Sequence, residues 1–444
     1  MIEEAVIIYN EKVRKSILGL PLLMRQILNG NQAGLKKFYV LGPDCPENIQ
    51  FIKSINLDKR IRSLEIQINY LNIGELLKTA DSSRPDFKNR NFFLMTGDTL
   101  CSPQLFKNYV NLDSPLEKPL IFTRKKANLD EDSMEELNLA ICPGRIWPRL
   151  AAAVGKELAN NSILKLSTLF SEFSFSYLQN QEIYFYRITS GSDEKRAIRA
   201  LLSTARKPQD GFIARKINRP ISLFLTRYLI KFNLSPTKLS IFNFILGLGA
   251  AFLVSLGQGY WYFLAGAFLF EFSSIFDGCD GEVARLTYQT SEKGALTDVI
   301  FDALTYILFF IGLAVGLYRQ TQSQRYLVML ILFLLSVSWY YINLYRYTRA
   351  SGIGTKIFLV AKEVEASSQK ENNLTFLDRI LSKLAFAVRR DFFATLVFAL
   401  MAMGWSAFTL YLVIGGSWVE SIYFHFYVSR KLDRPRTQPE NYFG

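Results

Sequence analysis

From about residue 238 onward, long apolar stretches alternate with short basic ones, and this alternation limits the possible folds more than any other feature. A helix needs about 20 consecutive, mostly apolar residues to cross a bilayer. The stretches that meet this requirement are 239–258, 261–279, 295–317, 326–345, 391–408 and 410–428. We therefore expect an all-α membrane domain with six transmembrane helices over 238–432, followed by a tail at 433–444.

The charge distribution predicts how such a domain would be oriented. The chain has a formal net charge of +13, and many of its basic residues lie in the stretch 346–390 and after residue 429. Loops on the cytoplasmic side carry the excess of Lys and Arg. Both ends are therefore expected in the cytoplasm, with the protein in the cell (inner) membrane. Nucleic acid is not an expected partner, because no compact basic and aromatic module is present.

Residues 1–203 have the pattern of a layered α/β domain. Short β-like runs alternate with helical patterns, as in "EAVIIY" (4–9), "KKFYVLG" (36–42) and "NFFLMTG" (91–97). Alternating strands and helices favour a mostly parallel sheet. The acidic start "MIEEAVIIYNEK" is not typical of a secretory signal, so this domain is expected to be cytosolic.

The junction at 204–237 combines basic and apolar residues. Apolar positions recur at spacings of three and four, between cations such as Arg215, Lys216, Arg227 and Lys231. This pattern predicts an amphipathic helix on the cytoplasmic face of the membrane. The alternative is an ordinary surface helix packed on the soluble domain.

Four carboxylates lie in and beside apolar spans, where each is costly. Asp277 and Asp280 come at the end of the second span, and Asp298 and Asp302 come at the start of the third. Spacings of three and four residues place each pair on one helix face. A loop containing Gly281 and Gly294 is expected to let the two helices lie side by side, so that all four carboxylates converge.

A cluster of this kind needs cations to offset its repulsion. Oxygen ligands select hard divalent metals, so two Mg²⁺ or Mn²⁺ ions are expected, and they could hold a pyrophosphate. Arg285 provides planar donors for phosphate oxygens. The small residues Gly281, Ala284 and Gly294 would suit close approach of a nucleotide. A carboxylate not used fully by metals could accept a proton from an attacking hydroxyl.

These residues resemble the signature of CDP-alcohol phosphotransferases, D-x2-D-G-x2-A-R-x8-G-x3-D-x3-D, and the match has no departures. "LSPTKLS" (234–240) and "RRDFF" (389–393) are also similar to segments of that family. The resemblance implies a homodimeric membrane enzyme that transfers the substituted phosphoryl group of a CDP-alcohol to another alcohol and releases CMP. It implies that Asp302 is the general base. The metal ligands would be Asp277, Asp280, Asp298 and Asp302, and the nucleotide site would be Asp277, Gly281, Ala284, Arg285 and Gly294.

The N-terminal half resembles sugar-phosphate nucleotidyltransferases, so its fold is expected to be Rossmann-like. "FFLMTGDTL" (92–100) is similar to a strand ending in their metal-binding Asp, here Asp98. The order of the two halves, and residues 206–222 between them, resemble bifunctional enzymes that join an inositol-1-phosphate cytidylyltransferase to a di-myo-inositol-phosphate-phosphate synthase. The glycine-rich phosphate loop is absent, because "AVIIY" continues directly into "NEKVRKSILG". Since that loop cradles phosphate on backbone N–H groups, the domain is expected to be catalytically inactive.

The identity of the two alcohols is open at this stage. The donor could be CDP-diacylglycerol or a soluble CDP-inositol, and the acceptor a polar alcohol such as an inositol phosphate. An anionic acceptor needs cations beside the carboxylates. The candidates are Arg219, Arg346, Arg349, Lys356, Arg389 and Arg390. The alternatives are a noncatalytic transporter or nucleotide- or metal-sensing anchor, and a bifunctional enzyme with an active cytidylyltransferase domain.

Overall fold

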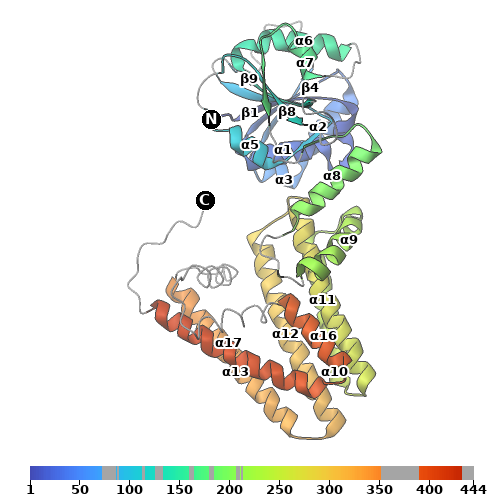
Figure 1. Cartoon of the computed structure of the whole chain (residues 1–444), viewed down its shortest axis with the longest axis vertical. Coiled ribbons are helices and arrows are strands. Elements are labelled where there is room, and N and C mark those ends of the chain that lie inside the picture. The colour runs from blue at the N-terminus through green and yellow to red at the C-terminus, as the bar shows by residue number, and fades with distance from the viewer. Residues whose placement is uncertain are drawn as a thin grey trace. The chain divides into compact units, whose positions relative to one another are not determined.

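The computed structural model describes residues 1–72, 87, 90–112, 116–125, 134–159, 165–179, 185–206, 211, 214–351 and 390–432. The chain divides into two compact units. The N-terminal unit comprises Met1–Ala205 with Leu286–Tyr288, and the helical unit comprises Arg206–Arg285 and the residues from Gln289 onward. Figure 1 shows the first unit as a layered α/β domain and the second as a set of long helices.

A seven-stranded sheet in the order β10-β8-β9-β6-β1-β4-β5 forms the centre of the N-terminal unit. Its strands are β1 (Glu4–Ile8), β4 (Lys37–Gly42), β5 (Gln67–Asn72), β6 (Asn91–Thr96), β8 (Leu120–Lys125), β9 (Met134–Pro143) and β10 (Ser176–Gln179). β1 runs parallel to β4 and β6, β4 to β5, and β10 to β8, whereas β9 is antiparallel to both of its neighbours. The predicted α/β domain with a mostly parallel sheet is confirmed.

Helices cover both faces of this sheet, which explains why its strands are apolar on both sides. Successive side chains of a strand point to opposite faces. Ile7 of β1 accordingly packs in one core with α1 (Leu22–Gln32), α2 (Pro46–Leu57) and α5 (Pro103–Tyr109). Ile8 packs in a second core with α6 (Trp147–Ala159) and α7 (Leu166–Leu169). The smaller elements are η1 (Glu11–Arg14), β2 (Ser16–Ile17), β3 (Leu20–Pro21), α3 (Lys59–Arg62), β7 (Thr99–Cys101), η2 (Gly144–Ile146), β11 (Phe185–Arg187) and α8 (Gly191–Thr204).

The helical unit consists, in its described residues, of η3 (Ala214–Asn218), α9 (Arg219–Leu229), η4 (Ile230–Phe232), α10 (Pro236–Leu256), α11 (Tyr260–Leu286), α12 (Glu292–Thr321), α13 (Arg325–Ser351), α16 (Arg390–Ala402) and α17 (Ser406–Leu432). The first four apolar stretches expected from the sequence correspond to α10, α11, α12 and α13, and the stretch 410–428 lies within α17. The stretch 391–408 was placed too far along the chain, because α16 ends at Ala402 and α17 begins at Ser406. Only α10, α12, α13 and α17, among the described helices, are both long and apolar enough to cross a membrane.

The predicted count of six spans is therefore not confirmed. α11 is 27 residues long, but its C-terminal part carries Asp277, Asp280, Glu282 and Arg285, which lower its hydropathy. The apolar part of α16 is shorter and runs from Phe392 to Ala402.

α10 and α12 pack closely because small residues line their contact. A Cβ at Gly312 would collide with the carbonyl group of Ala251, and a Cβ at Gly316 would collide with that of Val254. Small residues four apart are a common way to bring two membrane helices together, since they let the backbones touch. This contact fixes α12 beside α10. It thereby sets the position of the first turns of α12 along the axis of α10.

The connection between α11 and α12 is shorter than the sequence predicted. Gly281 lies inside α11 and Gly294 lies in the first turn of α12, so neither belongs to a loop. The expectation of a loop containing both was wrong, because a single glycine does not end a helix that its neighbours stabilise. The break comes at Tyr288, which has a left-handed φ of 56°, and Ser291 then caps α12 by accepting from the backbone N–H of Gly294.

Candidate functional site: a carboxylate cluster between two helices

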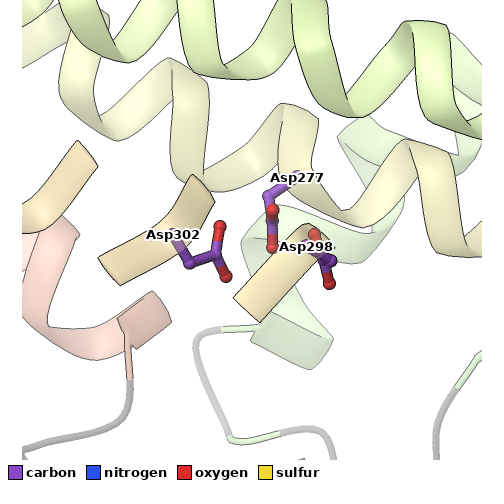
Figure 2. A group of neighbouring side chains, drawn as sticks. All are labelled: Asp277, Asp298 and Asp302. Carbon is purple, nitrogen blue, oxygen red and sulfur yellow. The ribbon is translucent and has the colours of Figure 1, made fainter. Parts of the chain in front are cut away.

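Three of the four predicted carboxylates meet between α11 and α12. Asp277 extends from α11, and Asp298 and Asp302 extend from the first turns of α12, with ligand oxygens that all lie within 4.8 Å of one another. Figure 2 shows the three carboxyl groups side by side between their helices. Each residue is partly buried, so water solvates the charges incompletely. Carboxylates this close repel one another, and a divalent cation would offset that repulsion.

Asp280 has a different environment from the other three. It is buried, its Oδ2 accepts a hydrogen bond from Ser240 Oγ, and its Oδ1 accepts one from the backbone N–H of Gly281. The structure thus brings together Asp277, Asp298 and Asp302, whereas Asp280 is held by α10 outside that group of three.

α10 orients both aspartates of α11, Asp277 and Asp280. Asn243 Nδ2 donates to Asp277 Oδ1 at 3.2 Å, and Ser273 Oγ donates to Asn243 Oδ1 at 2.8 Å. Asn243 and Ser273 are both buried. Ser240 and Asn243 lie three residues apart, so they share the face of α10 that looks toward α11. Supporting hydrogen bonds of this type set the direction of metal ligands.

These supporting residues were not predicted from the sequence, although a signal for them was present. Ser240 and Asn243 are polar residues at helical spacing within an apolar span. Polar side chains in such a span face a protein neighbour or a functional group rather than lipid.

The predicted nucleotide residues occupy neighbouring turns of the same helices. Arg285 lies one turn after Gly281, and a Cβ at Gly281 would be only 3.2 Å from Arg285 Nη1. Ala284 is in the turn between them and is partly buried. Gly294 belongs to the capped first turn of α12. These residues therefore lie on the segments that carry Asp277 and Asp298.

The predicted acceptor cations are spread over several elements. Arg219 is in α9 and makes an ion pair with Glu282, with Nη1 and Oε1 2.9 Å apart. Arg346 and Arg349 are exposed on α13. Lys356 and Arg389 lie outside the described residues, and Arg390 is the first residue of α16. Acceptor binding by these cations stays a prediction.

The oxygen-only donor set of the cluster fits a hard divalent ion. Three carboxylates from two helices provide negative charge at one point, and Asp277 is already oriented by Asn243. Mg²⁺ and Mn²⁺ favour such ligands, whereas zinc is usually bound through sulfur or imidazole nitrogen. The described residues near the cluster thus match the metal class predicted from the sequence.

Asp98, which matches the metal-binding Asp of the nucleotidyltransferases, is closed off inside the N-terminal unit. It follows β6 and is 5% exposed, and its Oδ2 accepts from Arg187 Nε at 2.8 Å. Ligands of open α/β sheets usually bind beyond the strand ends where the order of strands reverses, which here is between β1 and β6. Val13 of η1 is fully buried there and packs against Gly97, where any side chain would collide with it.

Fold and site together define the class of protein: a helical domain with four helices long and apolar enough to cross a membrane, in the part of the chain that the structure describes, and a carboxylate cluster suited to a divalent metal, preceded by an α/β domain. Residues 233–419 match the model of the CDP-alcohol phosphatidyltransferase family. This part of the chain is thus a domain of that family, as the signature predicted.

Several curated proteins are similar to this chain. The bifunctional IPC transferase and DIPP synthase of Archaeoglobus fulgidus is 35% identical over 169 residues, which are 38% of this chain and 32% of that protein. The protein of the same description from Thermococcus kodakarensis is 41% identical over 111 residues, 24% of each chain. The one from Rubrobacter xylanophilus is 31% identical over 181 residues, 41% of each chain. The chain thus spans less than half the length of these relatives.

Solved structures similar to this chain include the inositol-1-phosphate CTP transferase of T. maritima, at 11% identity and a TM-score of 0.33, covering 45% of this chain and 94% of that one. The 4-diphosphocytidyl-2C-methyl-D-erythritol synthase of Anaerococcus prevotii aligns at 16% identity and a TM-score of 0.33, covering 45% of this chain and 97% of that one. The N-terminal unit belongs to the α/β class because of its own strand order.

Proposed function

We propose that the protein is a membrane-bound CDP-alcohol phosphotransferase that moves the substituted phosphoryl group of a CDP-alcohol to a second alcohol and releases CMP. The observation that supports this most is the meeting of Asp277, Asp298 and Asp302 inside a complete family signature. The donor is of the CDP-diacylglycerol or CDP-inositol type. An inositol phosphate is the first acceptor to examine, because the curated relatives are described as IPC transferase and DIPP synthase.

In the proposed reaction, a hydroxyl oxygen of the acceptor forms a bond to the phosphorus that carries the donor alcohol. The bond from that phosphorus to the bridging oxygen breaks, and CMP leaves with this oxygen. Asp302 takes the proton of the attacking hydroxyl, and this makes the hydroxyl oxygen a stronger nucleophile. Arg285 donates to phosphate oxygens and keeps the pyrophosphate beside α11.

Two divalent ions, when bound, would neutralise charge on the phosphate groups during the displacement. Asp277, Asp298 and Asp302 are the residues placed to hold them. Asp280, although it lies outside this group of three, would contribute a fourth carboxylate ligand, with its direction set by Ser240 and the N–H of Gly281. Mg²⁺ and Mn²⁺ both suit this oxygen site.

Beyond the site, the proposal includes a homodimer in the cell membrane, with six spans and with both ends in the cytoplasm. α9 would lie on the cytoplasmic lipid surface. Its residues Ile221, Phe224 and Tyr228 are 40%, 60% and 45% exposed and recur at spacings of three and four. Exposed Arg227 and Lys231 lie beside them and suit anionic headgroups.

We further propose that the N-terminal unit does not transfer nucleotides. Val13 fills the position where the strand order reverses, and Arg187 neutralises Asp98. A carboxylate held in this way is poorly placed to bind a metal, because Arg187 would have to move first. A separate cytidylyltransferase must then supply the CDP-alcohol.

Membranes containing the wild-type chain, supplied with Mg²⁺ or Mn²⁺, test the first proposal. CDP-diacylglycerol and CDP-inositol are each combined with inositol phosphates, and CMP and products are identified by mass spectrometry. We expect CMP release that falls by about 10²-fold or more in Asp302→Asn. Glu172→Gln, an exposed glutamate of the N-terminal unit, is the matched control and should keep full activity.

Equal CMP release by wild type and Asp302→Asn would overturn the assigned mechanism. Release no greater than in membranes without the chain would favour the noncatalytic transporter or sensing anchor. Pyrophosphate release from CTP and an inositol phosphate would show that the N-terminal unit is an active cytidylyltransferase, and would overturn the second proposal.

A further inference from the structure

Glu282 is a buried acid that the signature does not include, although it lies inside the signature segment between Gly281 and Arg285. Its side chain is fully inaccessible to solvent. Oε1 accepts from Arg219 Nη1 at 2.9 Å and from Ser222 Oγ at 2.6 Å, and Oε2 accepts from Thr226 Oγ1 at 2.7 Å. Both carboxylate oxygens are thus bound by side chains of one other helix, α9.

The three donors form one face of α9, because they are spaced by three and four residues. Burying a carboxylate is costly unless it is paired and its oxygens accept hydrogen bonds. Arg219, 11% exposed at its side chain, supplies the charge, and the two hydroxyls complete the set. This contact is therefore specific, and it fixes the rotation of α9 as well as its distance from α11.

The contact includes the turn of α11 that begins at Asp277. A Cβ at Gly278 would lie 2.8 Å from Arg219 Nη1, so α9 approaches α11 as closely as a glycine permits. Cys279 Sγ lies 3.6 Å from the carbonyl oxygen of Ser222. Residues 278, 279 and 282 lie on a different face of α11 from Asp277 and Asp280. α9 therefore holds one face of this segment, while α10 holds the carboxylates on another through Asn243 and Ser240.

We propose that Glu282 is a positioning residue, whose buried pairing with Arg219, Ser222 and Thr226 holds the metal-ligand turn of α11 in the orientation that brings Asp277 to Asp298 and Asp302. This inference rests on the proposed function only in that the cluster binds metal. It also assigns Arg219 to the support of α11 rather than to contact with the acceptor.

Mn²⁺ binding is the direct test, because it needs no turnover. The full chain in lipid nanodiscs is titrated with Mn²⁺ in the absence of substrate, and free Mn²⁺ is measured by electron paramagnetic resonance. We expect Glu282→Gln and Arg219→Met each to weaken Mn²⁺ binding by about 10-fold or more, as loss of a supporting partner does at other metal sites. The double variant should recover most of this loss, since neither charge is left buried alone.

Thr226→Val removes one hydroxyl and keeps the ion pair, so it tests the same contact without a buried unpaired charge. We expect the loss of this single hydrogen bond to weaken Mn²⁺ binding by about 2- to 10-fold. Glu172→Gln is the control and should bind Mn²⁺ as the wild type does. Unchanged Mn²⁺ binding in Thr226→Val and in the folded single charge variants would overturn the proposal.

Measurement of CMP release in the same preparations separates the two proposals. If Arg219→Met raised only the KM for the acceptor and left Mn²⁺ binding unchanged, Arg219 would be an acceptor ligand and the positioning role would be wrong. A different result would separate the proposals in the other direction: wild type binds Mn²⁺, the variants bind it more weakly, and no CDP-alcohol releases CMP. The proposed function would then be wrong, whereas the positioning role of Glu282 would stand.

Discussion

Asn243 Nδ2 donates to Asp277 Oδ1 at 3.2 Å, so a residue of α10 sets the direction of a carboxylate on α11. Asn243 is itself held by Ser273 Oγ at 2.8 Å. The cluster is thus supported by a chain of two hydrogen bonds through the buried residues Asn243 and Ser273. Its loss would remove a contact that directs Asp277 toward the two carboxylates of α12.

Replacing Asn243 should therefore weaken metal binding without removing a ligand. We expect Asn243→Ala to raise the Mn²⁺ dissociation constant by about 10- to 100-fold, the usual effect of losing a supporting partner. Binding is measured by titration in nanodiscs. Asn108→Ala, at an exposed asparagine of α5, is the control. Equal affinity for Asn243→Ala and wild type would show that Asp277 needs no help from α10.

The same substitution should change stability differently at two glycines, because one lies in the close contact of α10 and α12 and the other does not. Gly316→Ala places a methyl group against the carbonyl of Val254, and overpacking of this kind costs about 1–3 kcal/mol. At Gly415 of α17, an added methyl group would meet no atom within 4 Å among the described residues, so Gly415→Ala should be neutral or slightly stabilising. Thermal unfolding in detergent compares them. Equal midpoints would mean that the contact adapts readily.

The exposed apolar face of α9 predicts that lipid covers it. Phe224→Glu places a charge in the middle of this face, whereas the matched change Lys216→Glu alters charge at an exposed basic position. We expect Phe224→Glu to make the α9 region more accessible to hydrogen exchange in nanodiscs, by about 10-fold, as loss of roughly 1.4 kcal/mol of protection would do. Unchanged exchange would indicate that α9 faces water.

Acid should selectively weaken the start of α8. Hydrogen bonds from Thr189, together with those from Ser190, lower the pKa of Asp193 to about 2. The unfolded value is about 3.9, so the stabilisation is complete above about pH 4 and is lost as the pH falls through about 2. Asp193→Asn should speed hydrogen exchange at the α8 N-terminus at neutral pH, by an amount that shrinks toward pH 2. A difference that grew in acid would contradict this assignment.

Much of the α/β domain could be predicted from residue patterns. The runs around Val6, Tyr39 and Leu94 are strongly apolar, and buried parallel strands need such runs on both faces. The packing at Gly97 was not predictable. Val13 fills the space beside Gly97 because the chain turns back directly after β1, and no local pattern shows which residue will occupy a crevice between two strands.

The candidate site, too, could be predicted only in part from the sequence. The spacing of Asp277 and Asp280 on one helix, and of Asp298 and Asp302 on another, follows from the 3.6-residue period of a helix. Spacing does not show which of the four converge. The position of α12 against α10 decides this, and Asp280 is held by Ser240 outside the group of three.

By itself, the sequence determined the class of each half, the metal type that the carboxylates suit, and the family of residues 233–419. These follow from composition and from spacing within single helices, which are local properties. The tertiary structure alone showed that Asn243 and Ser240 orient the carboxylates, and that Arg219 pairs with Glu282. These contacts join residues 34 to 63 positions apart, and only the packing of one helix on another brings such residues within hydrogen-bonding distance.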